Sequence, residues 1–251
     1  MNLAAAQAIA LTPEWPAPAS VRAAFTLRSG GVSTAPYDTL NLGAQVGDDA
    51  DRVRENRARV CEWLQLPAEP AWLEQVHGTE VLEVAAASPR RAGPADAVVA
   101  RERGAVAVIQ VADCLPVLFA STDGAVVAAA HAGWRGLAAG VLESTVTRLG
   151  RDPARLLAWI GPGIGAAHFE VGDEVRTAFV AHDRAATQAF IPNHRKRWQC
   201  DLVQLARQRL QRIGVTGVFG GRWCTYADRS RFFSFRRDGR CGRMAALIWL
   251  A

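Results

Sequence analysis

The chain has 251 residues, half of them hydrophobic, and a formal net charge of +5. This length allows one large hydrophobic core, so we expect a single domain over residues 21–251, preceded by a loosely packed Ala- and Pro-rich lead-in over residues 1–20. The positive charges are mostly arginines that are spread along the chain and interleaved with acids. The one compact basic run, residues 194–197, is predicted to be a solvated loop, which disfavours a nucleic-acid partner.

The cysteine pattern and the lack of long apolar runs predict a cytoplasmic protein. The five cysteines are odd in number and widely spaced, with no CxxC pair, which is typical of a reducing compartment. The N-terminal segment lacks the basic start of a signal peptide, and no stretch approaches about 18 uninterrupted apolar residues. We therefore expect no membrane contact, and no feature of the sequence indicates an obligate protein partner.

Apolar runs that end at glycine, proline or polar turns predict a succession of strands and helices. The first half is predicted to contain a strand at 21–27, a scaffold helix at 50–66, two short strands within 71–84, and strands at 96–100, 105–111, 116–120 and 126–130. The second half is predicted to contain helices at 137–149, 173–181 and 201–213, a strand at 156–160, and short β segments at 215–219, 231–235 and 244–250. Clustered strands without a regular βαβ rhythm favour an α+β fold with mixed sheets.

Three of these apolar segments lead into residues that can bind a metal or act as a nucleophile: His77, Cys114 and His131. Two imidazoles and a thiolate suit Zn²⁺, and three protein ligands leave the fourth tetrahedral position open, as in catalytic zinc sites. Because the three residues lie on separate segments, their spacing alone is not diagnostic. A Cys114 nucleophile with His131 or His77 as its base, or three unrelated buried residues, stay open as alternatives.

Copper is the less favoured metal. Two histidines and one cysteine also describe a blue-copper centre, but such a centre usually has a weak axial methionine. The chain contains only two methionines, Met1 and Met244, and its five histidines are too few for a full multicopper oxidase.

Several separate motifs occur in order along nearly the whole chain after the lead-in. They are FTLRSGGVS at 25–33, NLG at 41–43, EQVHG at 74–78, ADCLPV at 112–117, HAGWRG at 131–136, IGPGIG at 160–165 and RRDG at 236–239. Together they resemble the motifs of the YfiH-type laccase-domain family, whose members are described as purine nucleoside phosphorylases.

This resemblance implies a single domain of stacked mixed sheets flanked by helices, similar to an α/β/β/α sandwich. It implies one zinc ion held by the three residues that are also the expected catalytic residues, His77, Cys114 and His131. The activities that it implies are phosphorolysis of adenosine, inosine, guanosine and methylthioadenosine, and deamination of adenosine to inosine. The implied partners of the protein are therefore small molecules, purine nucleosides and phosphate.

Four residues are expected to contact substrate or phosphate. Arg28 precedes a Gly-Gly pair that forms either an anion cradle or a simple turn, and the resemblance implies a position near phosphate for this arginine. Asn41 lies in the neighbouring loop motif. The resemblance makes Arg236 or Arg237 a phosphate or anchoring contact, whereas the residues alone also fit a solvated hairpin with a turn at 238–239.

Other polar residues near the motifs keep two interpretations each. Asp113 either faces away from the metal ligand that follows it or orients that ligand from behind. Glu74 and Glu170 are candidates for the acid in deamination. Arg135 either anchors substrate or caps carbonyl groups, and His168 either contacts substrate or is structural.

Three other functions stay open at this level. A zinc or cysteine amidohydrolase that edits peptidoglycan precursors would use the same residues. A copper-dependent polyphenol oxidase, or laccase, is the older label of the resembling family. A nucleotide-binding module without catalytic activity is the non-enzymatic alternative.

Overall fold

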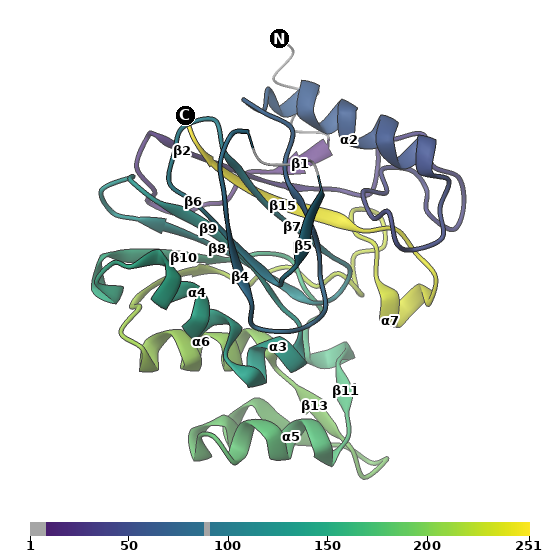
Figure 1. Cartoon of the computed structure of the whole chain (residues 1–251). Helices are drawn as coiled ribbons and strands as arrows, with labels where there is room; N and C mark the ends of the chain where they lie inside the picture. The colour runs from purple at the N-terminus through teal and green to yellow at the C-terminus, as the bar shows by residue number, and fades with distance from the viewer. Residues whose placement is uncertain (1–8, 88–90) are drawn as a thin grey trace.

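Two β-sheets stacked face to face form the centre of the molecule, and helices cover the outer face of each sheet (Figure 1). The computed structural model describes residues 9–87 and 91–251. The four-stranded sheet contains, in order, β1 (Ala10–Leu11), β2 (Val21–Thr26), β15 (Met244–Leu250) and β7 (Val106–Val111). The six-stranded sheet contains, in order, β14 (Gly217–Gly220), β10 (Leu156–Ile160), β8 (Leu115–Ser121), β9 (Val127–Ala132), β6 (Ala97–Ala100) and β4 (Val81–Val84).

Both sheets are held mainly by antiparallel pairs, with parallel pairs at the two edges of the six-stranded sheet, β10 with β14 and β4 with β6. Two smaller sheets lie outside this pair. One contains β11 (Glu170–Val171), β13 (Trp198–Cys200) and β12 (Phe190–Pro192), and the other contains β3 (Trp72–Glu74) and β5 (Arg91–Pro94).

Successive side chains along a strand point to opposite faces of its sheet, and both faces are apolar here, which explains why helices cover the outer faces of the two sheets. On β15, Ala246 and Ile248 enter the core between the sheets, whereas Leu247 and Trp249 face α2 (Ala50–Leu64). A strand that is buried on both faces must present apolar residues at every position, as this one does.

The outer face of the six-stranded sheet is apolar in the same way. Phe119 and Ala128 pack with Leu142 and Leu205 in one cluster. The helices on this side are α3 (Trp134–Ala139), α4 (Val141–Leu149), α5 (Asp173–Val180) and α6 (Leu202–Arg212), joined by short 3₁₀ turns at Pro153–Arg155, Ala166–His168 and Arg184–Ala189. The resulting order of layers, helix, sheet, sheet and helices, confirms the α+β fold of stacked mixed sheets predicted from the sequence.

Some elements differ from the prediction. The expected helix at 137–149 is two helices, because Gly140 adopts φ 102° and ends α3 before α4 begins. The expected strand at 231–235 is a loop followed by α7 (Phe235–Asp238), since the N–H of Phe233 donates to Met244 Sδ rather than to a strand. Within the expected loose lead-in, β1 pairs with β2, and residues 1–8 lie outside the described residues.

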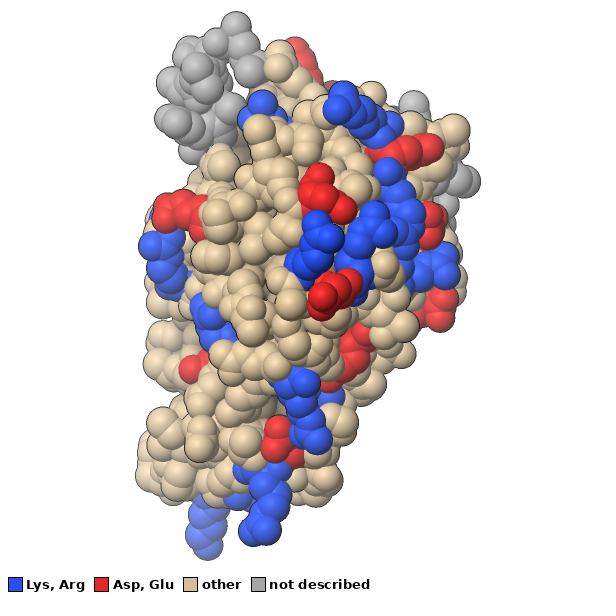
Figure 2. Space-filling view, turned by 90° about the vertical axis from the view of Figure 1, so that its left-hand side faces the viewer, with Lys and Arg blue, Asp and Glu red and all other residues tan. Residues whose placement is uncertain are grey.

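Charges of both signs alternate on the surface. Figure 2 shows basic residues, which are arginines apart from a single lysine in the whole chain, interspersed with acids on one face of the molecule. The basic run at 194–197 belongs to the turn between β12 and β13. Across residues 9–87 and 91–251, every helix is too short or too polar to span a bilayer.

Candidate metal centre and cavity

A cavity of about 680 Å³ contains His77, Cys114 and His131 in its wall. His77 follows β3, Cys114 lies between β7 and β8, and His131 is on β9. The pairing of β8 with β9 sets Pro116 opposite His131, so Cys114 lies close to the end of the histidine's strand. The three predicted residues are thus brought together from three separate segments.

The donor atoms are arranged to hold one metal ion. One ligand atom from each residue lies within 4.8 Å of the others, and His77 Nε2 is 3.9 Å from Cys114 Sγ. Zinc–nitrogen and zinc–sulfur bonds of about 2.0 and 2.3 Å in tetrahedral geometry place such donors about 3.3 to 3.5 Å apart. The spacing found here therefore fits a metal with only small movement of the side chains.

Asp96, which the sequence reasoning missed, organises two of the three ligands. Its buried carboxylate accepts a hydrogen bond from His131 Nδ1 at 2.8 Å, and the N–H groups of Val76, His77 and Gly78 donate to it at 3.1, 2.9 and 2.6 Å. A carboxylate on Nδ1 leaves Nε2 of the histidine to face a metal. The only sequence signal for this role is a lone acid at the start of the apolar strand β6.

The charges around Cys114 favour its thiolate, which is the form of the side chain that binds metals. Burial raises the pKa of Cys114, but the adjacent charge and hydrogen bonds of His131 and His77 outweigh it and lower the pKa to about 6. Burial lowers the pKa of His131, but the Cys114 thiolate and Asp96 outweigh it and raise the pKa to about 9. A thiol that ionises this readily is available as a ligand near neutral pH.

One of the candidate ligands and the residue that precedes another adopt backbone conformations that are unusual for residues other than glycine. His77 itself has φ 61° and Asp113 has φ 88°. Such conformations persist only when surrounding contacts hold them, and they cluster at functional sites. Here Asp96 holds the His77 backbone, and Asp113 binds the Thr225 hydroxyl at 2.6 Å and the Arg236 N–H at 2.7 Å.

Gly133 leaves room for the ligands to approach each other. A Cβ at this position would lie 2.9 Å from Cys114 Sγ and 3.0 Å from His77 Cδ2. The first distance is shorter than real Cβ contacts and the second is tighter than nearly all of them, so a larger residue in place of this glycine of the HAGWRG motif would force Cys114 or His77 to move.

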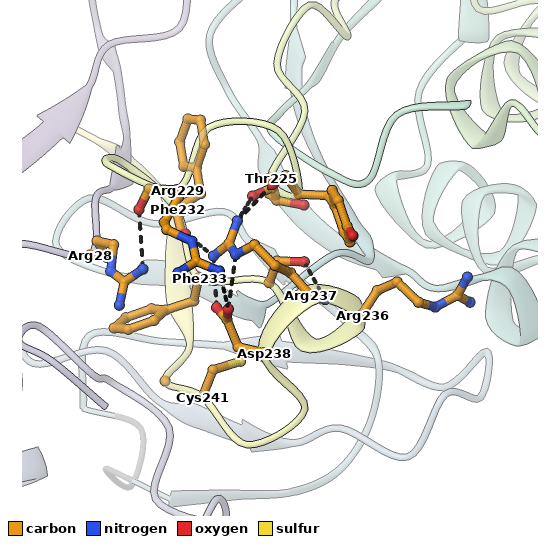
Figure 3. Close-up of polar contacts among 12 residues, drawn as sticks. Arg28, Thr225, Arg229, Phe232, Phe233, Arg236, Arg237, Asp238 and Cys241 are labelled. Atoms are coloured by element: carbon orange, nitrogen blue, oxygen red, sulfur yellow. Dashed lines mark hydrogen bonds and ion pairs between the residues drawn. The ribbon is translucent and has the colours of Figure 1, made fainter. Parts of the chain in front are cut away.

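Three of the four residues expected to contact phosphate lie outside the cavity wall. The Arg28 guanidinium donates to the carbonyl groups of Asp38 and Arg229, as the latter bond in Figure 3 shows. Asn41 is fully buried and its side chain joins Gly43, Asp48 and the Arg243 N–H.

Arg237 is also occupied internally. Its guanidinium donates to the carbonyl groups of Thr225, Tyr226 and Phe232 and pairs with Asp238. Arg236 behaves differently: its side chain extends away from this network in Figure 3 and lines the cavity, where it donates to the Glu170 carbonyl.

Four arginines line the cavity: Arg57, Arg135, Arg236 and Arg243. Among the residues that the structure describes, none of the four forms an ion pair with a carboxylate. The sequence indicated a role for Arg135 and Arg236 only. Arg57 was missed because it belongs to the segment at 50–66, which the sequence predicts to be a scaffold helix.

Arg57 and Arg243 flank the peptide between Leu42 and Gly43 at the cavity wall. Arg57 donates twice to the Leu42 carbonyl, at 3.0 and 2.8 Å, and stacks on Trp72 with 4.0 Å between guanidinium and ring centroid. The Arg243 side chain packs so closely on Gly43 that a Cβ there would lie 2.7 Å from Arg243 Cγ. Both arginines therefore contact the same segment of the wall, Leu42–Gly43.

Of the other candidate residues, Glu74 and Arg135 line the cavity. Glu170 is not part of the cavity wall; it accepts a hydrogen bond from Asn193 and pairs with Arg195. His168 stacks on Tyr226 with 4.4 Å between ring centroids and is not part of the cavity wall.

Comparison with known proteins places this arrangement in a family. Residues 22–251 match the model of a family described as multi-copper polyphenol oxidoreductase laccase. The chain is 55% identical to a Pseudomonas aeruginosa protein named purine nucleoside phosphorylase PA4543, over 96% of this chain and 98% of that protein. It is 52% identical to the Escherichia coli protein named purine nucleoside phosphorylase YfiH, with the same coverage.

Solved structures agree with this result. The protein NMB0706 from Neisseria meningitidis is 47% identical and superposes with a TM-score of 0.92, over 96% of this chain and 98% of that chain. YlmD from Geobacillus stearothermophilus is 32% identical with a TM-score of 0.88, over 96% of both chains. The chain therefore belongs to the laccase-domain family that its motifs resemble, the family described as multi-copper polyphenol oxidoreductase laccase.

Proposed function

We propose that this protein is a zinc-dependent purine nucleoside phosphorylase that acts on adenosine, inosine, guanosine and methylthioadenosine and also deaminates adenosine. The names of relatives with up to 55% identity support the phosphorylase activity. The observation that carries the proposal is the combination in one cavity of a His77–Cys114–His131 donor set and four arginines without ion pairs among the described residues.

Zinc fits the donor set better than copper. A blue-copper centre adds a weak axial methionine to two histidines and a cysteine. Met244 is fully buried, accepts the Phe233 N–H through its sulfur and is not part of the cavity wall. Met1 lies outside the described residues. When bound in such a site, zinc supplies a Lewis acid and lowers the pKa of a water molecule.

The arginines of the cavity wall supply positive charge for binding phosphate, the anionic substrate. In phosphorolysis a phosphate oxygen forms a bond to the anomeric carbon of the ribose, while the bond from that carbon to the purine breaks. We assign phosphate to Arg57 and Arg243, whose planes are set by Trp72 and by backbone contacts, because rigid donors bind phosphate at little entropic cost. Burial lowers the pKa of Arg57 to about 10, so a bound anion would stabilise its charge.

Deamination needs a group that transfers protons. Glu74 lines the cavity three residues before His77, whereas Glu170 is not part of the cavity wall. We therefore assign proton transfer to Glu74. Carboxylates serve in this way beside the metal in zinc deaminases.

Chromatography of inosine and adenosine incubated with the zinc-loaded protein, with and without phosphate, tests the proposed function. We expect hypoxanthine from inosine only when phosphate is present, and inosine from adenosine. Absence of turnover of both nucleosides by the zinc-loaded protein would contradict the proposed function. Oxygen uptake with a phenol by copper-loaded protein would favour the oxidase instead.

Replacement of Arg57 by methionine should raise the KM for phosphate roughly 10- to 100-fold, because a hydrogen bond to a charged group contributes about 1.5 to 3 kcal/mol. The KM for inosine should change little. Initial rates at varied phosphate and saturating inosine measure the effect.

Arg59→Met is a matched control, since Arg59 lies on the same helix and pairs with Glu55 outside the cavity. An unchanged KM for phosphate in both Arg57→Met and Arg243→Met would remove these arginines from the phosphate subsite.

A further inference from the structure

Phe235 is an exposed aromatic residue in the cavity wall. Three large apolar side chains are exposed among the described residues: Val76 at 53%, Ile191 at 65% and Phe235 at 58%. Phe235 lines the cavity and Val76 directly precedes His77, whereas Ile191 lies on β12, away from the cavity. Cavities that bind small molecules are lined mainly by hydrophobic and aromatic side chains, together with a few polar groups.

The short helix that carries Phe235 is firmly held. Ser234 accepts the N–H of Arg237, and Asp113 accepts the N–H of Arg236. The Arg237 guanidinium ties the same turn to three carbonyl groups of the preceding loop (Figure 3).

This anchoring also links the turn to the metal centre. Asp113 directly precedes Cys114, and its second carboxylate oxygen accepts the Thr225 hydroxyl. The ring of Phe235 is therefore exposed and yet positioned relative to Cys114 by a buried carboxylate. Contact residues that are rigid before binding lose little entropy when the ligand arrives.

The surroundings of the ring are cationic and aromatic. The Arg243 guanidinium lies 5.9 Å from the ring centroid of Phe235, and the next residue along the chain, Arg236, lies 5.2 Å from the ring centroid of Phe169. Phe169 also lines the cavity and is buried. A ligand that suits this part of the wall has a flat apolar ring joined to a polar or anionic part that can reach the arginines.

We propose that Phe235 stacks on the purine base of the nucleoside and so determines the preference for purines over smaller bases. This inference rests on the proposed function, because it assigns one part of the same cavity to the base. Each base has a π face, and stacking on an aromatic side chain strengthens with the area of the base. A two-ring purine covers more of the exposed ring than a one-ring pyrimidine does.

Kinetics of Phe235→Ala test the inference. We expect the KM for inosine to rise about 5- to 100-fold, as is typical for the loss of one stacking contact. The kcat should fall much less, and the KM for phosphate and the bound zinc should stay unchanged. Phe235→Trp should restore the KM for inosine, and Ile191→Ala, which removes an equally exposed side chain elsewhere, should leave it unchanged.

The Phe235→Leu variant distinguishes stacking on the base from hydrophobic contact alone. Leucine keeps most of the hydrophobic surface without a π face, so its KM for inosine should lie close to that of Phe235→Ala. A wild-type KM for inosine in either variant would overturn the inference while leaving the phosphorylase activity intact.

Calorimetric titration with inosine in the absence of phosphate makes the test independent of turnover. Weaker binding by at least fivefold in Phe235→Ala supports the inference even if the wild-type protein proves catalytically inactive. Equal binding by the two proteins, or no binding by the wild type, overturns it.

Discussion

Replacement of Cys114 by alanine should remove the bound metal and both proposed activities. The thiolate is one of three donors, and two imidazoles alone hold zinc far less tightly. Because loss of even an outer contact typically weakens a metal site 10- to 100-fold, we expect loss of a ligand to lower activity by at least about 100-fold. Elemental analysis after dialysis against a weak chelator, together with initial rates on inosine and adenosine, measures both effects.

The fold should survive this change. Cys114 is half-buried at the end of the sheets rather than inside the core, so circular dichroism of the Cys114→Ala protein should match that of the wild type. Cys61→Ala is the matched control, because Cys61 is also half-buried but lies on α2, outside the cavity wall. Full activity in a metal-free Cys114→Ala protein would refute a metal-dependent mechanism.

Replacement of Asp96 by asparagine should weaken the metal site and the fold together. One carboxylate oxygen accepts from Val76 and Gly78, and the other from His77 and His131. Asparagine has one oxygen, so one of these two pairs of donors loses its acceptor inside the protein. We expect zinc affinity to fall about 10- to 100-fold and the free energy of unfolding to fall by about 1 to 3 kcal/mol.

Competition with a coloured chelator measures the zinc affinity, and denaturant unfolding of the metal-free protein measures the stability. Asp49→Asn serves as the control, because Asp49 caps α2 and asparagine caps a helix about as well. If Asp96→Asn bound zinc as tightly as Asp49→Asn, Asp96 would not be the residue that orients His131.

The layers of the fold were predictable because burial leaves a strong pattern in sequence. Strands buried on both faces appear as continuous apolar runs, as β8 and β9 do. The segment at 231–235 shows where this reasoning fails. Its consecutive phenylalanines are both fully buried in a loop, and a run of apolar residues does not distinguish that arrangement from a strand.

The clustering of the three candidate metal donors could be predicted for a related reason. His77, Cys114 and His131 each follow or end an apolar segment, and the structure brings them within reach of one another. The arginines that line the cavity could not be predicted this way. Whether an arginine such as Arg28 turns inward to backbone carbonyl groups, or like Arg57 into a cavity, depends on loops distant in sequence.

The missing side chain of Gly133 gives a criterion for evaluating related sequences. A β-carbon at this position would collide with both the thiolate and the first imidazole. A homologue that keeps the histidines and the cysteine but carries a larger residue two positions after the second histidine would have to open its donor set. We expect such a protein to bind a metal weakly or not at all, even though an inventory of ligand residues alone would count its site as intact.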